Sequence, residues 1–400
     1  MLFLISDVFS EDAQQRLRGA GHDVRYEPAL KGAELTAALA EMQPQVLVVR
    51  STKVTEADLD AAPALELVVR AGAGVDTIDV GAASRRGVFV ANCPGKNSAA
   101  VAELAMGLLL ALDRRIPDNV AQARAGHWDK AGFSKASGLK GRTLGLVGFG
   151  SIGREVAARA QAFGMRVVVW SRSLDDETAA EAGVERMESP LALAGVADAV
   201  SVHVASTPDT RGLLDAAFFD ALRPGGLVIN TARDIVIDEA AMRRAIEEKG
   251  VRVATDVPPN EPAVKEGPFD YDLARNDAFY VTHHIGASTD EATDAIGAEA
   301  LRVVLAYADT GSAPNVVNLA DRTPATHLLT VRHLDRVGVL AAVLAEARRA
   351  GWNVQEMENV VFAGAEAACA RIRFDGAPDA GALDRIRAVE HVLNATVMGL

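Results

Sequence analysis

The sequence predicts an α/β fold with two doubly wound parallel sheets, followed by a smaller C-terminal domain of ferredoxin-like type. Short apolar runs alternate with helical patterns through the first 90 residues, as in parallel strands joined by crossover helices. A second alternating series begins at a glycine-rich turn, Gly148–Gly153. After residue 323 the order of expected elements changes to β-α-β-β-α-β, which is the ferredoxin-like order.

The first series contains four expected strands separated by amphipathic helical patterns. This alternation predicts a parallel, doubly wound sheet. The four strands are Leu2–Ile5, Val46–Val49, Leu67–Val69 and Val88–Val90.

The second series begins with an apolar strand that runs into the glycine pattern G-x-G-x-x-G. Gly148 permits a tight turn, Gly150 leaves room for a pyrophosphate beside the backbone, and Gly153 allows close packing of helix and strand. A helix over Arg154–Phe163 would point its positive end at the phosphates. A purely structural turn is the alternative, but the strand–turn–helix–strand context predicts a bound dinucleotide.

The end of the next strand, Met165–Trp170, bears on which dinucleotide binds. An acidic residue usually contacts the ribose of NAD about 20 residues after the glycines, and an arginine there accommodates the phosphate of NADP. This chain has Ser171, Arg172 and Ser173 at that place, so NADP is favoured. The alternative is that Asp175 or Asp176 binds the ribose and that the cofactor is NAD.

The remaining elements complete the three domains. An alanine-rich helix from Ser98 to about Arg124 is expected to bridge the two sheets, and Thr289–Tyr307 to return the chain to the first. Asp309–Thr323 has the composition of a linker. The other strands of the second sheet are expected at Ala199–Val202, Gly226–Ile229, Val251–Thr255 and Phe279–Val281. The C-terminal elements are expected at Leu328–Arg332, Val337–Ala350, Val354–Phe362, Ala367–Phe374, Ala380–Val389 and Val392–Met398.

Composition excludes several classes of protein. Of the 400 residues 49% are hydrophobic, which predicts folded domains, and the net charge of −13 argues against nucleic acid or an anionic membrane as partner. Only two cysteines occur, Cys93 and Cys369, which indicates neither a disulfide framework nor a metal cluster. The first residues lack the basic segment and long apolar core of a signal peptide, so we expect a soluble, cytoplasmic protein.

Charged residues follow three strands of the second series. Arg233 follows the first strand, Asp256 and Glu261 the second, and His283 and His284 the third. Ligands bind at this edge of doubly wound sheets. A histidine suits removal of a hydroxyl proton, a carboxylate can orient it, and an arginine can hold a substrate carboxylate, so the set predicts hydride transfer on a 2-hydroxy acid.

These residues stand among longer stretches with a family pattern, which run over essentially the whole chain: Val48–Thr55, Val69–Asp79, Gly87–Asn92, Asn97–Gly107, the glycine turn, Asn230–Glu239, Asp256–Pro262 and His284–Ser288. On them the chain resembles the D-isomer-specific 2-hydroxyacid dehydrogenases. The resemblance implies a flavodoxin-like substrate domain (1–96 and 286–318), a Rossmann cofactor domain (97–285) and an ACT-like regulatory domain (324–400).

The resemblance also implies roles for single residues. Arg233 would bind substrate, Glu261 would pair with the histidine, and His284 would be the acid/base. The backbone amides of Ala73 and Gly74 would hold the substrate carboxylate, with Arg50, Ser51 and Lys53 reaching a phosphate. The implied cofactor contacts, besides the glycines and the Ser171–Ser173 strand end, are Ser151, Ile152, Val204, Thr231, Ala232, Asp256, Gly286 and Ala287.

Three positions depart from the family pattern. Asp234 replaces a glycine beside Arg233, His283 replaces a proline, and Val337 replaces a proline in the ACT-like module. Alternatives also exist for individual roles: Arg233 could pair with Asp234 or Asp238, and Arg50 and Lys53 could be surface charges. In the C-terminal domain His333, Asp335 and Asn353 are candidate contacts for L-serine, the alternative being an assembly module without ligand.

We therefore expect an enzyme that oxidises D-3-phosphoglycerate to 3-phosphohydroxypyruvate, a step of serine biosynthesis, as a homodimer or homotetramer. An NADPH-dependent glyoxylate or hydroxypyruvate reductase is the first alternative. A dinucleotide-sensing, corepressor-like binding protein is a more distant one. No metal site is expected.

Overall fold

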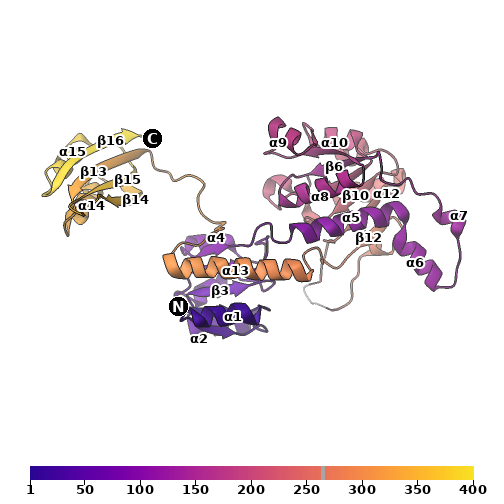
Figure 1. Ribbon diagram of the computed structural model, residues 1–400, viewed down its shortest axis with the longest axis horizontal. Coiled ribbons are helices and arrows are strands. Elements are labelled where there is room, and N and C mark those ends of the chain that lie inside the picture. Colours follow the sequence, from indigo (N-terminus) through magenta and orange to yellow (C-terminus); the bar gives the residue numbers. More distant parts are fainter. Residues whose placement is uncertain (263–265) are drawn as a thin grey trace. The chain divides into compact units, whose positions relative to one another are not determined.

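A computed structural model describes residues 1–262 and 266–400 (Figure 1). The chain forms two compact units, Met1–Asn318 and Leu319–Leu400. The first unit contains two parallel sheets, each with its helices, and these are here called the first and second lobes. The second unit contains one antiparallel sheet.

The first lobe has a five-stranded parallel sheet in the order β2-β1-β3-β4-β5, which is the flavodoxin-like order. Its strands are β1 (Leu2–Ile5), β2 (Asp23–Tyr26), β3 (Val46–Val49), β4 (Leu67–Arg70) and β5 (Phe89–Ala91). Strand β3 is buried along its whole length because helices cover both faces of the sheet.

Helices from distant parts of the chain cover this sheet. One face packs against α1 (Glu11–Gly19) and α13 (Asp290–Thr310), so the chain returns to the first lobe after completing the second (Figure 1). The other face packs against α2 (Ala33–Met42), α3 (Glu56–Ala61) and α4 (Val80–Arg85).

The second lobe has a seven-stranded parallel sheet in the order β12-β11-β10-β9-β6-β7-β8. Counted from its own first strand, this is the 3-2-1-4-5-6 order of dinucleotide-binding folds with one strand added. The strands are β6 (Thr143–Val147), β7 (Arg166–Trp170), β8 (Glu185–Arg186), β9 (Ala199–Val202), β10 (Leu227–Asn230), β11 (Arg252–Thr255) and β12 (Phe279–Val281).

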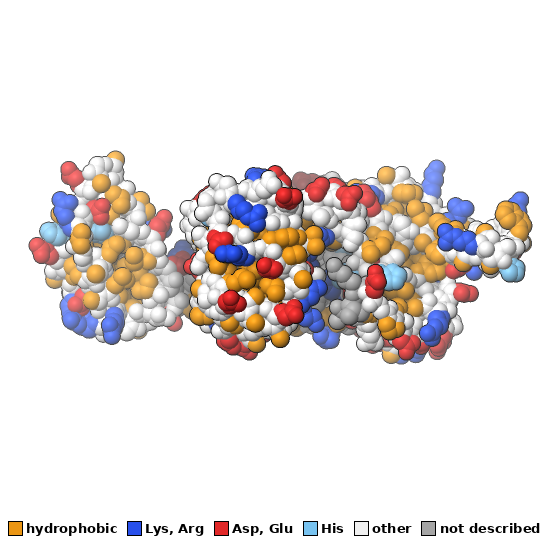
Figure 2. All heavy atoms as spheres, turned by 90° about the horizontal axis from the view of Figure 1, so that it is seen from below, with side chains coloured by type: hydrophobic (Ala, Val, Ile, Leu, Met, Phe, Trp, Pro, Cys, Tyr) orange, Lys and Arg blue, Asp and Glu red, His pale blue; other side chains and the backbone are white. Residues whose placement is uncertain are grey.

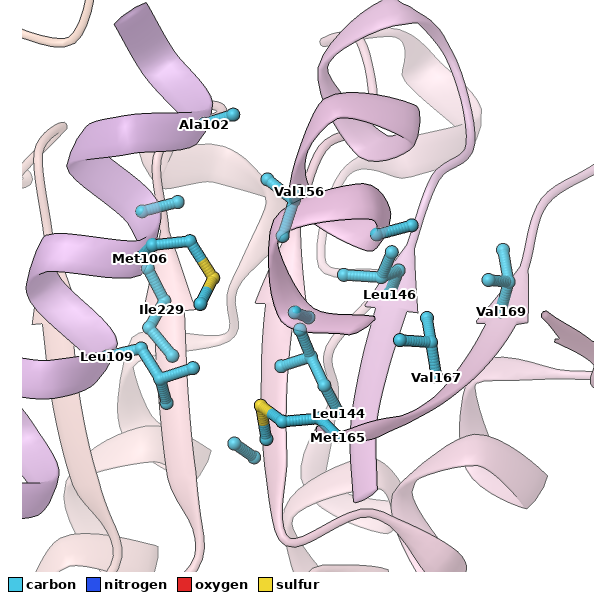
Figure 3. Close-up of a cluster of buried hydrophobic side chains, with 14 of the residues drawn as sticks. Ala102, Met106, Leu109, Leu144, Leu146, Val156, Met165, Val167, Val169 and Ile229 are labelled. Carbon is cyan, nitrogen blue, oxygen red and sulfur yellow. The ribbon is translucent and has the colours of Figure 1, made fainter. Parts of the chain in front are cut away.

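Helices α5 and α8 pack side by side on one face of this sheet. Figure 3 shows Met106 and Leu109 of α5 facing Leu144 of β6, with Val156 of α8 and Ile229 of β10 completing the buried layer. Helices α10 to α12 cover the other face. The helices of this lobe are α5 (Ser98–Arg114), α6 (Ile116–Arg124), α7 (Lys130–Phe133), α8 (Ser151–Ala162), α9 (Asp176–Glu181), α10 (Pro190–Val196), α11 (Ala216–Ala221) and α12 (Glu239–Lys249), with the 3₁₀ turns η1 (Pro208–Thr210), η2 (Asp234–Val236) and η3 (Asp272–Arg275).

The second unit has the strand order β14-β15-β13-β16, and its core includes Val343 of α14 and Ile386 of α15. Its antiparallel sheet and β-α-β-β-α-β element order are ferredoxin-like, as expected. The elements are β13 (His327–Leu334), α14 (Val339–Arg349), β14 (Asn353–Val361), β15 (Ala367–Asp375), α15 (Ala380–Arg387) and β16 (Val392–Gly399).

The prediction of a single long helix from Ser98 to about Arg124 was wrong. Arg115 adopts a left-handed conformation (φ 52°), and Pro117 lies in the first turn of the next helix, so α5 and α6 are separate. Proline cannot donate the hydrogen bond that a continuous helix needs there, and this is the physical reason for the break. The edge strands β2 and β8 were not expected.

Candidate active site

The strand ends that carry the predicted catalytic residues are neighbours in the second lobe. Strands β10, β11 and β12 lie in that order, and Arg233, Asp256 and His284 follow their carboxyl ends. The structure therefore brings these three segments together at one edge of the sheet.

His284 forms a close pair with Glu261. Its Nδ1 lies 2.7 Å from Glu261 Oε2, and the two side chains are 42% and 46% exposed. A carboxylate can only accept, so this contact places the imidazole proton on Nδ1 and leaves the Nε2 lone pair free to take a proton. The geometry is that of an oriented general base.

The backbone of His284 is held in an unusual conformation by Asp256. His284 has φ 52°, in the left-handed region, which costs on the order of 1–3 kcal/mol for a non-glycine residue. The buried Asp256 carboxylate accepts hydrogen bonds from Ile285 N (2.9 Å), Gly286 N (2.8 Å) and Thr282 Oγ1 (2.6 Å). Asp256 thus fixes the turn that aims His284. Its expected contact with a nicotinamide stays a prediction.

Arg233 pairs with Asp76 of the first lobe. Asp76 Oδ2 accepts from Nε (3.1 Å) and Nη2 (2.7 Å) of Arg233, and Nη1 donates to the carbonyl of Ala232 (2.6 Å). The alternative that Arg233 pairs with Asp234 or Asp238 was wrong, and Asp238 instead caps helix α12 through Ala241 N.

The segment predicted to reach a phosphate is organised by Asp7, a residue that sequence reasoning missed. Its Oδ2 accepts from the backbone amides of Arg50 (2.7 Å), Ser51 (3.0 Å) and Thr52 (2.9 Å). Burial opposes ionisation, but these hydrogen bonds outweigh it and hold the pKa of Asp7 below its ordinary value. Lys53 is exposed next to this segment, and Arg50 Nη2 lies 3.5 Å from Thr293 Oγ1 of α13.

Arg70, at the end of β4, is a second residue that sequence reasoning missed. Its Nε is buried with no hydrogen-bond partner in the described chain. Burial and the neighbouring charge of Arg233 lower the pKa of Arg70, and Asp76 acts in the opposite direction. Gly72 makes room for it, because a Cβ there would lie 1.5 Å from Arg70 Nη1. An arginine that follows a strand next to glycines was the available signal.

The backbone amides of Ala73 and Gly74, which were expected to hold the substrate carboxylate, lie in the turn that follows Arg70. Ala73 O accepts from Asn92 Nδ2 (2.6 Å), and over the described residues neither amide donates a hydrogen bond. Both therefore fit the predicted role of binding a carboxylate.

The glycine turn fits a dinucleotide. Gly148 has φ 105°, and a Cβ there would lie 2.5 Å from His203 O and 3.0 Å from Val204 Cγ1. A Cβ at Gly150 would meet nothing within 4 Å, and no side chain caps the N-terminus of α8 there. The backbone at Gly150, with the exposed Ser151 next to it, is therefore open to a phosphate.

Among the side chains that bear on the selection of NAD or NADP, Arg172 and Ser173 are exposed and Ser171 is half-buried. Arg172 Nη1 lies 3.2 Å from Asp209 Oδ2. Asp175 caps helix α9 through Thr178 N (2.8 Å), and Asp176 pairs with Arg186, so both alternative ribose ligands already have partners. Ser171 and Ser173 flank Arg172 at the end of β7.

The other expected cofactor residues line the same edge. Thr231 Oγ1 is buried without a partner among the described residues, and Ala232 is buried behind it. His203 was not expected: burial lowers its pKa to about 3, so it is neutral, and its Nε2 lies 2.8 Å from Ser201 Oγ. Ile152 and Ala287 are half-buried, and Gly286 is buried.

The three candidate serine contacts are not brought together within one copy of the second unit. His333 is 1% exposed, with Nδ1 2.8 Å from Leu334 O and Nε2 3.1 Å from Asn359 Oδ1. His333 pairs with Ala368 of β15, whereas Asn353 pairs with Asp375. At the rise of a β-strand this separates them by roughly 20 Å. Asp335 lies at the same end of the sheet as His333, where its backbone amide donates to Glu366 O.

Three further findings concern the described residues. Within residues 1–262 and 266–400 no group of three or more His, Cys, Asp and Glu side chains could hold a metal ion. None of the described helices combines the length and the apolar character needed to cross a membrane. On the face drawn in Figure 2, acidic, basic and apolar side chains are intermixed.

Known proteins share this architecture. Residues 106–286 match the family model for the NAD-binding domain of D-isomer-specific 2-hydroxyacid dehydrogenases. The TT0316 protein of Thermus thermophilus has a crystal structure that is 31% identical and superposes with a TM-score of 0.69, over 79% of this chain and 100% of that one. The chain belongs to the D-isomer-specific 2-hydroxyacid dehydrogenase family.

Within this family the chain is similar to D-3-phosphoglycerate dehydrogenases. It is 39% identical to that of Methanocaldococcus jannaschii over 321 residues, which are 79% of this chain and 59% of the relative. The NAD⁺-bound 3-phosphoglycerate dehydrogenase of Entamoeba histolytica is 26% identical with a TM-score of 0.66, over 80% of this chain and 99% of that one. The chain thus spans about three-fifths of the length of the curated relative.

Proposed function

We propose that this 2-hydroxyacid dehydrogenase oxidises D-3-phosphoglycerate to 3-phosphohydroxypyruvate with a nicotinamide dinucleotide, or runs the reverse reaction. The observation that carries the proposal is the Glu261–His284 pair at the sheet edge where Arg233 also follows a strand. The basic residues of the first lobe, Arg50, Lys53 and Arg70, supply charge for a second anionic group. The similarity to D-3-phosphoglycerate dehydrogenases supports the same substrate.

The residues divide the chemistry between them. In the oxidation direction His284 Nε2 takes the proton of the C2 hydroxyl, and the charge of Glu261 stabilises the imidazolium that forms. Arg233 holds the substrate carboxylate and the oxygen on C2, with the Ala73 and Gly74 amides as further donors. The backbone at Gly148 and Gly150 would hold the pyrophosphate of a dinucleotide, whose nicotinamide would supply the acceptor for the hydride on C2.

The test is a comparison of substrates with wild-type enzyme. D-3-phosphoglycerate, D-glycerate and glyoxylate are each assayed with NAD(H) and NADP(H) in the direction that oxidises or reduces them. We expect the highest kcat/KM with phosphoglycerate. His284→Gln should lower kcat by at least about 100-fold while the dinucleotide Kd, measured by fluorescence, stays unchanged. Full activity of His284→Gln would rule out the assigned base.

NADP as the preferred cofactor is the second part of the proposal. Arg172 offers a cation for the 2′-phosphate once that phosphate replaces Asp209 as its partner, and Asp175 is engaged as the cap of helix α9. Arg172→Ala should therefore raise KM for NADP about tenfold or more with little change for NAD. Asp209→Asn, which frees Arg172, should lower KM for NADP. A wild-type preference for NAD that Arg172→Ala does not alter would contradict this part.

A glyoxylate or hydroxypyruvate reductase is the second candidate. Asp234, adjacent to Arg233, places negative charge near the site and would disfavour a doubly charged phosphate. Arg50→Ala distinguishes the candidates: it should raise KM for phosphoglycerate strongly and leave KM for glyoxylate unchanged.

We further propose an amino-acid effector site in the second unit, with L-serine bound between two copies through Asp335 of one and Asn353 of the other. Their separation within one copy supports a site shared by two copies, and hence a homodimer or homotetramer. Both cysteines are free, which supports a reducing, cytoplasmic location.

A further inference from the structure

Asp76 is a charged residue in the site to which no function has yet been assigned. It lies in the turn after β4, in the first lobe, and its side chain is 52% exposed. A single oxygen, Oδ2, accepts from both Nε and Nη2 of Arg233, at 3.1 and 2.7 Å. Arg233 follows β10 in the second lobe, so this ion pair joins the two lobes at the site.

The pair uses one edge of the guanidinium. Arginine has five N–H donors. Asp76 occupies the Nε–Nη2 edge, and Nη1 donates to Ala232 O. One N–H on Nη1 and one on Nη2 are left, and over the described residues neither donates to another group. Two such donors suit a carboxylate bound in a bidentate manner.

The turn around Asp76 is shaped to admit this pair. A Cβ at Gly74 would lie 2.4 Å from Arg233 Nη2 and 2.9 Å from Asp76 Oδ2, so glycine lets the pair form in this position without a shift of either side chain. Arg70 lies on the same turn, where Gly72 makes room for its guanidinium. Asp76 is thus the carboxylate that faces two neighbouring guanidinium groups.

We propose that Asp76 is a positioning residue that fixes the guanidinium of Arg233 by one edge and leaves the opposite N–H groups for the substrate carboxylate and the C2 oxygen. The inference rests on the proposed function and adds to it a residue from the other lobe. The proposed role is incompatible with another one, in which Asp76 occupies the place of the substrate carboxylate and is displaced when the substrate binds.

The test compares Asp76→Ala and Asp76→Asn with wild type on D-3-phosphoglycerate. Loss of the carboxylate frees Arg233 to shift, so kcat should fall about 100-fold in Asp76→Ala, with a smaller rise in KM. Asp76→Asn keeps an acceptor oxygen and should lose about tenfold. Glu185→Gln, which breaks the exposed pair with Arg166 on β7, is the matched control and should keep full activity.

A double-mutant cycle shows whether Asp76 acts through Arg233. Asp76→Ala should have almost no effect in an Arg233→Ala background, and the dinucleotide Kd should be the same in all variants. Additive effects would overturn the inference, as would a lower KM with unchanged kcat in Asp76→Ala, the outcome expected of a displaced carboxylate. Absence of wild-type turnover on every 2-hydroxy or 2-oxo acid would instead overturn the proposed function.

Discussion

At the scale of single residues, the contacts that organise the site join distant parts of the chain. The Asp7 carboxylate binds amides 43 to 45 residues away, and Asp76 binds a guanidinium 157 residues away. No local pattern marks Asp7, and the stretch Val69–Asp79 that contains Asp76 does not show which group that carboxylate binds. Arg233, Glu261 and His284 could be predicted because each stands in a short motif at a strand end. Asp7 and Asp76, which hold other site residues in place, could be identified only from the tertiary structure.

Asp7 leads to a prediction about pH. Because its folded-state pKa is lowered, its stabilising contribution is complete above the unfolded-state pKa and is lost as pH falls through the folded-state value. Asp7→Asn should reduce the free energy of unfolding at pH 7 by about 1–3 kcal/mol, and this difference should shrink below about pH 4. Urea titrations at several pH values measure it.

The same variant should also affect the substrate. Without the carboxylate the Arg50–Thr52 segment is held less firmly, so KM for phosphoglycerate should rise while kcat changes little. Asp60→Asn is the control, since it breaks the pair of Asp60 with Arg86, which makes no hydrogen bond to this segment in the described chain, and it should alter neither quantity. A difference in stability that persists at low pH would contradict the assigned cause.

At the scale of elements, the apolar strands could be predicted and the two polar edge strands, β2 and β8, could not. Strands β1, β3 and β9 lie where the apolar runs placed them, because burial on both faces demands such runs, and the apolar edge strand β12 was also found in its expected place. Strand β2 has one buried residue, Val24, and β8 has none, so neither leaves an apolar signal. The left-handed backbone of His284 is likewise set by Asp256 and not by its own sequence.

In the glycine turn after β6, substitution of glycine by alanine should lower stability at one position and dinucleotide affinity at another. Gly148→Ala adds a methyl group 2.5 Å from His203 O in a left-handed backbone, so the melting temperature should fall by several degrees or folding should fail. Gly150→Ala meets no atom within 4 Å, at φ −75°, so stability should hold. Its methyl group would nevertheless stand where the pyrophosphate approaches the backbone, and the dinucleotide Kd should rise at least about tenfold.

Calorimetric scanning and fluorescence titration measure these two quantities. Gly297→Ala on α13, a helical glycine whose Cβ would also meet nothing, is the control and should leave Kd unchanged and raise stability slightly. Unchanged dinucleotide affinity in Gly150→Ala would show that the phosphates do not bind at this turn.

At the scale of the whole molecule, catalysis and the expected regulation belong to different units. Every residue assigned to substrate, cofactor or catalysis lies within Met1–Asn318, and the core of the second unit is formed by its own residues, Leu329 to Val397. A chain ending at Asn318 should therefore fold and keep kcat and KM within about twofold. Loss of turnover with retained secondary structure would show that the second unit contributes to the site.

Serine binding should depend on two full-length copies. Because Asp335 and Asn353 lie at opposite ends of the β13–β14–β15 sheet, one copy cannot hold one amino acid with both. Isothermal titration with L-serine should give heat with the full-length protein and none with the chain ending at Asn318. Asn353→Ala should abolish the heat without changing kcat in the absence of serine. Absence of heat from full-length protein at millimolar serine would favour the alternative of an assembly module without ligand, and sedimentation of both chain lengths would test that alternative.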